Sequence, residues 1–427
     1  MSSLVGYLAY REQGIYPPSF LSRAETVKRA FSLGLSKYKD LEEVHRGGVT
    51  SLDIDPAEGR FLLSGSSSGE VVIHDLHNTT GSLKYTFKCV AHVKRPIGRG
   101  RQNVSTHAHS GSVETAQWYP LDTGMFLTSG MDSKLKIWDA NALVPADSYE
   151  FDSSVYCHDM SPIATKHTLV ACGIKGRIKL IDLRSGSASH TLQGHRKTVY
   201  TLKWSTREPY VLASGGADSR VLLWDIRSAK GSFMKLDQHN GASQSGNSEQ
   251  TSTAHSGAVN GLCFTSDGLF LVTFGTDERL RLWNTSNGKN TMVNYGKINN
   301  ENEKSVQVAI SNSCDPTLVY VPEFADVAVY DMFSGERYHT LRGHYHQVTS
   351  CAIHPNTHDL YSGSLDRNIL QWTADRDSVE EALYQHEHLG KDDGGEGKTV
   401  SRTSQVNADE WSSDEEELIN VPLEQFL

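Results

Sequence analysis

The sequence predicts an all-β ring of seven propeller blades, preceded by a helical segment and followed by an acidic tail. The first observation behind this prediction is a unit of roughly forty residues that recurs along the chain. The second is that four copies share four residue types at fixed offsets, and the third is the apolar alternation of short strands. One such unit cannot bury its own apolar face, so the copies are expected to pack side by side.

The copies are aligned by the pair of residues that closes each of them. Four copies have Trp at the first position of the pair, and three have His, Ile or Tyr there. Two junctions, of 64 and 59 residues, are longer than the others, which measure 42 to 47, and therefore contain insertions. In chain order the seven pairs are His74-Asp75, Trp138-Asp139, Ile181-Asp182, Trp224-Asp225, Trp283-Asn284, Tyr330-Asp331 and Trp372-Thr373.

The four copies that keep Trp also carry a His, a hydroxyl residue and an Asp. The Asp lies six residues before the Trp, the hydroxyl four residues before the Asp, and the His 28 or 29 residues before the Trp. The sets are His109, Thr128, Asp132 and Trp138; His195, Ser214, Asp218 and Trp224; His255, Thr273, Asp277 and Trp283; and His344, Ser362, Asp366 and Trp372.

This combination is the pattern of WD repeats, in which each copy forms a blade of four strands. We expect the Asp to hold the His ring, the His to reach the hydroxyl, and the hydroxyl to accept the indole N–H. A Ser-His-Asp set can also be catalytic, but its recurrence around a ring favours structural tetrads over one active site.

Three copies depart from this pattern but keep strand-like alternation. Copy one keeps His and Ser, copy three lacks the His, and copy six has aromatic residues at two positions. The residues concerned are His45, Ser64, Ser68 and His74 in copy one, Lys175 and Ile181 in copy three, and Phe324 and Tyr330 in copy six. We expect the ring to close by lending residues 41–45 to the last blade, which hides both sheet edges.

Residues 1–36 are predicted to form a helix-loop-helix, 37–375 the propeller, and 376–427 a disordered acidic tail. In the helical segment, Ser22 and Glu25 fit a capping box, and Gly34 is placed to end the helix. Val27 and Phe31 share one helix face. That face either packs on the propeller or anchors the chain in a groove of another protein.

Charge and composition exclude several classes of function. The net charge is −10, and residues 391–427, with ten acidic and three basic residues, account for −7 of it. The remaining −3 argues against a broad phosphate-binding surface. No apolar stretch is long enough to span a membrane. His107 and His109, like His344 and His346, alternate as strand ligands could, but two of them occupy tetrad positions, so we expect neither metal nor cofactor.

Two segments outside the blade pattern carry weaker signals. The first insertion, residues 84–101, is basic, and no acidic residue occurs between 76 and 113. It either meets nucleic acid or an acidic partner, or is a solvated loop. In the tail, Ser412 and Ser413 each have Glu three residues later and are candidate sites for an acid-directed kinase.

Copy four ends in Trp224-Asp225-Ile226-Arg227, which places Arg227 at a rim of the ring. Copy three places Arg184 in the same way, after Asp182. An arginine at a rim can pair bidentately with a carboxylate or carbonyl of a partner. The alternative is a local salt bridge to the preceding Asp.

The Trp-Asp-x-Arg ending resembles the box of WD-repeat substrate receptors of cullin-4 ubiquitin ligases. The chain up to about residue 375 further resembles the Cockayne syndrome A family within that group. The stretches that carry this likeness are 113–120 (VETAQWYP), 260–268 (NGLCFTSDG), 282–284 (LWN), 294–297 (NYGK) and 411–416 (WSSDEE). The sequence departs from that family at Ser68, where an Asp is usual, and in the longer end at 418–427.

The resemblance implies a non-catalytic receptor that acts in transcription-coupled nucleotide excision repair in the nucleus. The arginine would meet the damaged-DNA-binding adaptor, which connects to cullin-4 and its RING subunit, and the helix-loop-helix would insert into the adaptor. The opposite face would receive the Cockayne syndrome B translocase and stalled RNA polymerase II, without direct contact to DNA. The implied adaptor contacts are Arg227, Asp225, Arg184, Leu4, Leu8, Val27 and Phe31.

Two other functions stay open from the residues alone. One is a propeller scaffold that binds nucleic acid or chromatin through the basic insertion at residues 84–101. The other is a hydrolase with a metal or a catalytic triad in the central channel. Salt-sensitive DNA binding would favour the first, and stoichiometric zinc would favour the second.

Overall fold

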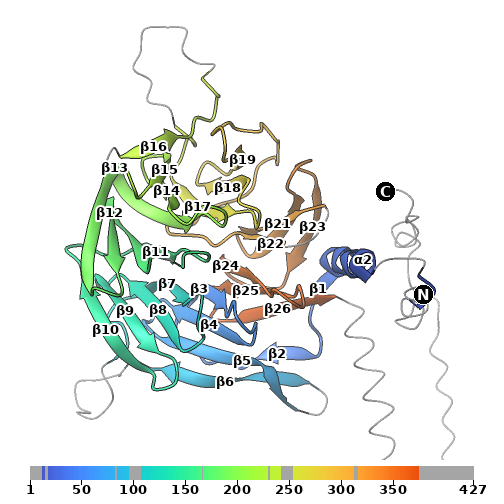
Figure 1. Ribbon diagram of the computed structural model, residues 1–427. Coiled ribbons are helices and arrows are strands. Elements are labelled where there is room, and N and C mark those ends of the chain that lie inside the picture. Colours follow the sequence, from blue (N-terminus) through green and yellow to red (C-terminus); the bar gives the residue numbers. More distant parts are fainter. Residues whose placement is uncertain are drawn as a thin grey trace, which may run out of the picture. The chain divides into compact units, whose positions relative to one another are not determined.

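The computed structural model describes residues 12–14, 18–81, 84–95, 107–165, 167–228, 231–241, 253–311 and 316–374. The chain divides into two units, residues 1–382 and 383–427, and all described residues belong to the first. In that unit the strands succeed one another around a central axis in chain order, from blue to red in Figure 1. The predicted all-β propeller is thereby confirmed.

The described strands form six hydrogen-bonded sheets. Five of them have three to five strands, and one has six. In hydrogen-bonding order they are β2 (Lys39–Leu41), β6 (Tyr85–Val93), β5 (Val71–Thr80), β4 (Phe61–Ser66) and β3 (Val49–Ile54); β10 (Val144–Glu150), β9 (Lys134–Asp139), β8 (Met125–Gly130) and β7 (Val113–Trp118); β11 (Cys157–Met160), β12 (Leu169–Asp182), β13 (Ser187–Trp204), β14 (Val211–Gly216), β15 (Val221–Asp225) and β16 (Ser232–Lys235); β17 (Val259–Phe264), β18 (Phe270–Gly275) and β19 (Leu280–Asn284); β20 (Ala309–Ile310), β21 (Leu318–Glu323), β22 (Asp326–Asp331) and β23 (Arg337–Arg342); and β1 (Leu33–Leu35), β26 (Ile369–Ala374), β25 (Leu360–Ser364) and β24 (Val348–Ile353).

The six-stranded sheet contains two of the predicted repeats. Its strand β13 pairs with β12 through residues 187–193 and with β14 through residues 199–204. The backbone N–H of Leu183 donates to the carbonyl of Thr168 at 3.1 Å, which brings the two ends of β12 together. The strand therefore turns back near Gly176, whose φ of +75° suits a residue without a side chain.

The apolar core lies between neighbouring sheets. One cluster joins Val211 and Leu223 of the six-stranded sheet to Val259 and Trp283 of the next sheet. Because each sheet is covered on both faces, its inner strands are buried throughout, as all six residues of β14 are.

The ring closes at a different place from the one expected. Strand β1, residues 33–35, pairs antiparallel with β26 of the last sheet. Leu41, which was expected to do so, lies in β2 and pairs in parallel with Phe87 of β6. The expectation of closure by residues 41–45 is therefore wrong. A strand of three residues with a central Gly34 has too few apolar positions to show a period of two.

The helix also differs in its ends. Helix α2 spans Pro18–Phe31, so Ser22 and Glu25 lie within it and the predicted capping box is wrong. Proline suits the first helical position, where no N–H is needed for a helical bond. Gly34 lies in β1 instead of ending the helix.

Candidate docking faces of the ring

Each of the four complete repeats brings its four predicted residues together. The histidine Nδ1 lies 2.8 or 2.9 Å from the Asp carboxylate, and Nε2 lies 2.7 or 2.8 Å from the hydroxyl oxygen. The indole N–H donates to the same hydroxyl at 2.7 to 2.9 Å. All four imidazoles are buried. The polar groups of the four sets therefore satisfy one another inside the blades.

Burial shapes the protonation of these sets. It lowers the pKa of His109, His255 and His344 despite the neighbouring carboxylates. For Asp132, burial acts to raise the pKa, but the bonds to His109 and to the backbone N–H of Ser110 bring it below its usual value. A neutral imidazole beside an ionised carboxylate, closed to solvent, is suited to fastening strands together.

The first repeat contains a substitution that sequence reasoning missed. In the complete sets the Asp also accepts the backbone N–H of the residue after the His, at 2.9 to 3.1 Å. In the first repeat the corresponding N–H of Arg46 donates to Glu70 at 3.3 Å. Glu70 lies two residues beyond Ser68, the position where the Asp was sought, and Ser68 donates to it at 3.1 Å.

Glu70 makes only one of the two contacts of the missing Asp: it accepts the backbone N–H but does not reach the histidine. His45 Nε2 lies 2.8 Å from the hydroxyl of Ser64, as in the complete sets. Its Nδ1 is buried and has no hydrogen-bond partner within the described part of the chain. Burial, with smaller contributions from His74 and His92, lowers the pKa of His45 to about 3. The first repeat therefore holds an uncharged, half-satisfied imidazole.

Arg227 lies two residues beyond strand β15 and forms the local salt bridge to Asp225 that was the alternative to a partner contact. Its Nε donates to one Asp225 oxygen at 2.9 Å and its Nη2 to the other at 2.7 Å. The guanidinium also lies 4.9 Å from the ring centre of Tyr210. The pair lowers the pKa of Asp225. Since the Arg227 side chain is 59% exposed, the local ion pair leaves much of the guanidinium open to a partner.

Arg184 is arranged differently, although its sequence context is the same. Asp182 accepts the hydroxyl of Thr168 at 2.7 Å and the backbone N–H of Arg184 at 3.1 Å. Arg184 is exposed, and its side chain forms no ion pair with Asp182. The His167 ring lies 5.4 Å from that of Tyr210, the ring that Arg227 contacts.

A second fork arises from a residue that no motif predicted. Arg60 donates through Nε and Nη2 to the two oxygens of Asp75, at 3.1 and 2.7 Å. Its guanidinium lies 5.0 Å from the Phe61 ring centre, and its side chain is 43% exposed. Arg60 precedes strand β4, whereas Arg227 follows β15, so the Trp-Asp-x-Arg pattern could not find it. Its place in the fork, beside the Asp of the closing pair, is equivalent.

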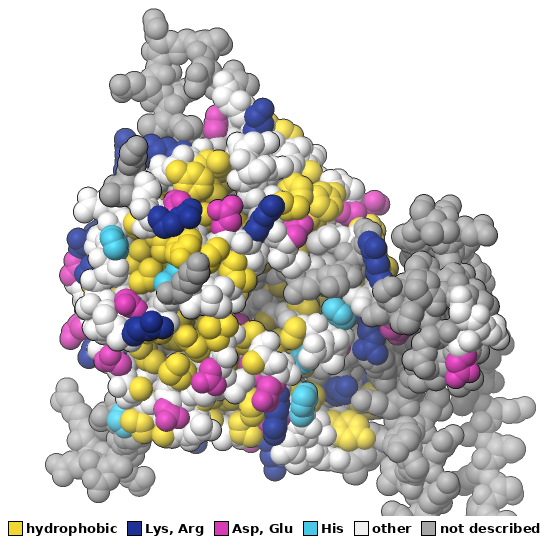
Figure 2. Space-filling view, viewed as in Figure 1, with side chains coloured by type: hydrophobic (Ala, Val, Ile, Leu, Met, Phe, Trp, Pro, Cys, Tyr) yellow, Lys and Arg dark blue, Asp and Glu magenta, His cyan; other side chains and the backbone are white. Residues whose placement is uncertain are grey.

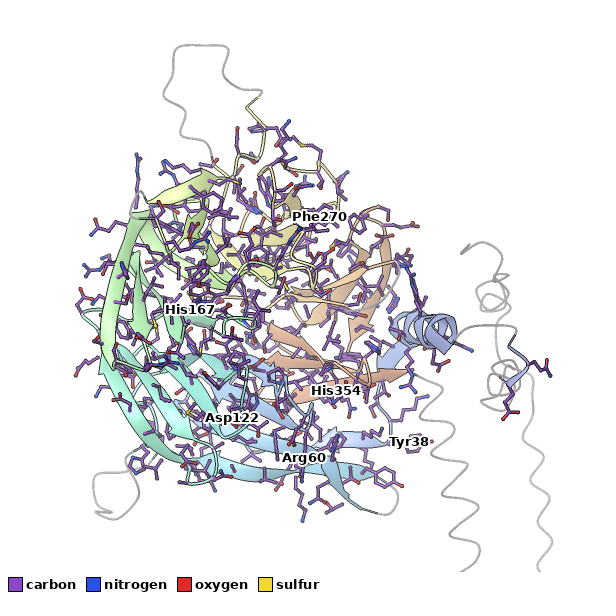
Figure 3. The ribbon with its side chains drawn as sticks, in the orientation of Figure 1. Tyr38, Arg60, Asp122, His167, Phe270 and His354 are labelled. Atoms are coloured by element: carbon purple, nitrogen blue, oxygen red, sulfur yellow. The ribbon has the colours of Figure 1, made fainter. Side chains whose placement is uncertain are left out.

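These arginines share a face with exposed apolar side chains. Figure 3 places Arg60, His167 and Phe270 around the side of the ring that faces the viewer. On that side, Figure 2 shows hydrophobic side chains gathered around the hollow centre, with charged ones between them. We call this surface the rim face. It is formed by the β3–β4, β7–β8, β11–β12 and β17–β18 loops and by the residues just after β15 and β22, because these segments leave their antiparallel sheets at the same end. We define it by six residues with exposed side chains there: Arg60, Leu121, Ile163, Leu269, Arg227 and Phe333.

Comparison with known proteins agrees with this architecture. The model of the "WD domain, G-beta repeat" family matches residues 100–139, 186–225, 246–284 and 335–373. The chain is 34% identical to the WD repeat-containing protein ATCSA-1 of Arabidopsis thaliana, over 88% of this chain and 96% of that protein. The chain belongs to the Cockayne syndrome A family of WD-repeat proteins. More distant matches are ribosome biogenesis protein WDR12 homologs of Drosophila persimilis, 25% identical, and Anopheles gambiae, 28% identical, each over 46% of this chain and 45% of the relative.

For a Cockayne syndrome A family member, the contacts implied for the helical segment are only partly visible. Val27 and Phe31 pack against a cluster that includes Leu341 and Trp372 of the ring. The Phe31 ring lies 4.7 Å from that of Tyr338, edge to face. Helix α2 therefore packs on its own propeller, beside β1 in Figure 1. Leu4 and Leu8, like Ser412, Ser413 and the tail at 376–427, lie outside the described residues.

The remaining expectations concern insertions, metals and membranes. In the basic insertion, Lys84 pairs with Asp40 at 3.2 Å, and residues 96–106 lie outside the described part. Within the described ranges, no three His, Cys, Asp or Glu side chains are grouped so that they could hold a metal ion. Nor does any helix there have the length and apolar character needed to cross a membrane.

Proposed function

We propose that this chain is the substrate-recognition subunit of a cullin-4 ubiquitin ligase, attached through the damaged-DNA-binding adaptor. The observation that carries the proposal is the exposed Arg227–Asp225 fork on the rim face of a Cockayne syndrome A family member. A guanidinium already oriented by a carboxylate and an aromatic ring loses little conformational entropy when a partner binds. Exposed apolar side chains around it provide the area that an interface needs.

The proposed role is recruitment without catalysis by this chain. It would bring the Cockayne syndrome B translocase and stalled RNA polymerase II to the ligase during transcription-coupled nucleotide excision repair in the nucleus. Holding a target beside the transferring enzyme raises its effective concentration, and this is how a receptor accelerates the reaction. The proposed contacts to cullin-4 and its RING subunit run through the adaptor.

We also infer a ring of seven blades, because counting the six-stranded sheet as two blades gives one blade for each predicted repeat. The proposed adaptor contacts are Arg227, Asp225 and Arg184 on the rim face, to which we add Arg60. Val27 and Phe31 would act by fixing helix α2 on the ring, so that Leu4 and Leu8 can be presented to the adaptor. Phosphorylation of Ser412 and Ser413 stays a prediction.

The test is recovery of the purified adaptor by the full chain. We expect Arg227→Ala combined with Arg60→Ala to reduce recovery by about ten-fold or more, since each variant removes an oriented charged anchor. The matched control is Arg342→Ala, which removes another exposed arginine with a carboxylate neighbour, Asp326, outside the rim face. Full recovery by the double variant, with its melting curve unchanged, would contradict the proposal.

The alternative, a scaffold that binds nucleic acid, rests on the basic insertion at residues 84–101. It predicts DNA binding that weakens steeply with salt. Replacing Lys84, Lys88, Lys94 and Arg95 by Gln would abolish that binding and leave adaptor recovery intact. Salt-dependent binding that is lost in this variant would favour the scaffold over the receptor.

A further inference from the structure

A group of cations lies at the end of the blades opposite to the rim face. Arg220 directly precedes strand β15 and Arg227 lies two residues beyond its end, so the two arginines lie at opposite ends of one strand. We call the group formed by Lys175, Arg196, Lys197 and Arg220 the basic cluster. Three of these side chains are exposed, and Arg220 is partly exposed.

Backbone contacts hold the basic cluster together. Lys175 of β12 is paired with Thr198 of β13, next to Lys197. The carbonyl of Thr198 accepts the N–H of Ala217 at 2.8 Å, and the N–H of Arg196 donates to Asp218 at 2.9 Å. The three segments that carry the cations, in β12, in β13 and just before β15, are therefore fixed against one another, and the cluster is preorganised.

The charges of the basic cluster are not balanced locally. The carboxylate in these three segments is Asp218, whose side chain is 5% exposed and bonded to His195. Arg177, also nearby, is paired with Asp152. None of the four cluster cations forms an ion pair with a residue in the described ranges. An uncompensated group of like charges on a fixed backbone attracts a segment of the opposite charge.

One cation stands where the repeat pattern would place the tetrad Asp. Lys175 lies six residues before Ile181, as Asp218 lies six before Trp224. The third repeat has thus replaced a buried carboxylate with an exposed ammonium, and it lacks the tetrad altogether. A local departure from a structural rule without a structural gain is characteristic of a functional site.

Two tyrosine rings and nearby acids narrow the class of ligand. Tyr200 follows Lys197 by three residues in β13, and the backbone N–H of Tyr156 donates to Gly173, two residues before Lys175. The ring centres of Tyr156 and Tyr200 are 5.9 Å apart, and both residues are partly buried. Asp152 borders the cluster on one side, and Glu303 is close enough to help burial and Tyr156 raise the pKa of Tyr200. The phosphates of a long nucleic-acid strand would be repelled by these two acids as the strand continued beyond the basic cluster. A short acidic peptide can bind to the cations without extending to the acids.

We propose that the basic cluster binds an acidic peptide segment of a recruited protein, with an apolar side chain of that segment against Tyr156 and Tyr200. The proposal rests on the proposed receptor function only in treating the bound protein as a substrate. Binding itself requires neither the adaptor nor the rim face. The segment would be recognised by charge and by one apolar contact, so its affinity would fall as salt rises.

The experiment uses the full chain and a fluorescein-labelled oligoglutamate peptide that contains one Phe, with anisotropy as the readout. We expect saturable binding that weakens with salt. In Lys175→Glu/Lys197→Glu the dissociation constant should rise about ten-fold or more, because two attractive contacts become repulsive. The matched control is Lys235→Glu/Lys289→Glu, which makes the same charge change at two exposed lysines elsewhere on the ring and should bind like the parent.

Several outcomes would overturn the proposal. They are absence of peptide binding by the parent, equal loss in both double variants, or an oligothymidine strand that displaces the peptide and depends more strongly on the cluster. If Lys175→Glu/Lys197→Glu melts early, Lys197→Glu alone, at an exposed position of strand β13, provides the comparison. Adaptor recovery by the cluster variants should equal that of the parent, so a failure of this proposal is distinguishable from a failure of the receptor function.

Discussion

The fourth and first repeats form antiparallel sheets of the same kind, but only the fourth has a complete tetrad. In the fourth, His195 is bonded on both nitrogens, and Trp224 donates to the hydroxyl that His195 reaches. In the first, His45 is bonded on one nitrogen only. His74 stands in place of the Trp and bonds to the carbonyl of Glu42 at 3.1 Å. The strands of both repeats nevertheless pair in the same antiparallel order.

This difference teaches that the tetrad reinforces the blade but is not a condition for forming it. The first repeat buries Val49, Leu52 and Leu62 against residues of the last sheet, such as Tyr361. Both repeats are stabilised by dense apolar packing between sheets. This contribution to stability is larger than the loss from one incomplete polar network. Positions released from the network are then free for other uses, as Lys175 illustrates in the third repeat.

The largest expected effect is the loss of the tetrad indole. Trp224→Ala should lower the free energy of unfolding by about 3 kcal/mol, because it opens a cavity and removes the donor to Ser214. His74→Ala, at the equivalent position of the first repeat, should cost about 1 to 2 kcal/mol, since the smaller side chain makes a single bond. Urea unfolding of the two variants measures the difference. His195→Ala should resemble Trp224→Ala.

Equal losses in the two repeats would break the comparison, because they would mean that the complete tetrad adds nothing to packing. A Trp224→Ala protein that melts with the parent would contradict the structural role altogether. Any loss of adaptor binding in Trp224→Ala is expected to follow the loss of folded protein. Measuring recovery below the melting transition tests this point.

We expect a decrease in pH to have an effect of intermediate size on the free energy of unfolding. Burial lowers the pKa of His45 to about 3, so this ring stays neutral in the folded chain, while in the unfolded chain it binds a proton below about 6.5. The unfolded state thus binds more protons in this window, and stability falls as the pH decreases from about 6.5. His45→Gln should reduce the slope of unfolding free energy against pH by about 1.4 kcal/mol per pH unit between pH 5.5 and 4.5.

The slope must be compared between variants rather than read from the parent. Asp53, whose pKa burial raises to about 7, binds a proton in the folded state and acts in the opposite direction. His158, which burial also brings to a pKa of about 3, provides an independent repeat of the test through His158→Gln. If neither substitution changes the slope, the two rings are not buried in neutral form.

The sequence predicted those features that repeat. Offsets of six, ten and about 28 residues located every member of the four complete tetrads, because a hydrogen-bond network fixes the distances between strands. Features that occur only once in the chain could not be predicted in this way. Glu70 lies two residues from the expected position, and Arg60 reaches Asp75 from the start of the neighbouring strand β4 instead of from the residues after the Asp.

The segment that closes the ring could not be predicted for a different reason. Whether residues 33–35 or 41–45 close the ring is decided by pairing with β26, a contact between distant parts of the chain. Neither segment is long enough for a local period to choose between them. The helix was found but its start was misplaced, because a Ser-x-x-Glu pattern is common inside helices as well as at their beginnings.

The smallest effect is expected from repairing the first repeat. Ser68→Asp would place a carboxylate where the complete sets have one, within reach of the unpaired Nδ1 of His45. It would also place that charge beside Glu70, which lies 3.1 Å from the Ser68 hydroxyl oxygen. The gained bond and the repulsion should nearly cancel, so the single substitution should change stability by less than about 0.5 kcal/mol.

In a Glu70→Gln background the same substitution should stabilise by about 1 kcal/mol, because the repulsion is gone. A double-mutant cycle measures this coupling, and equal effects in both backgrounds would show that Glu70 does not act as the substitute for the missing Asp.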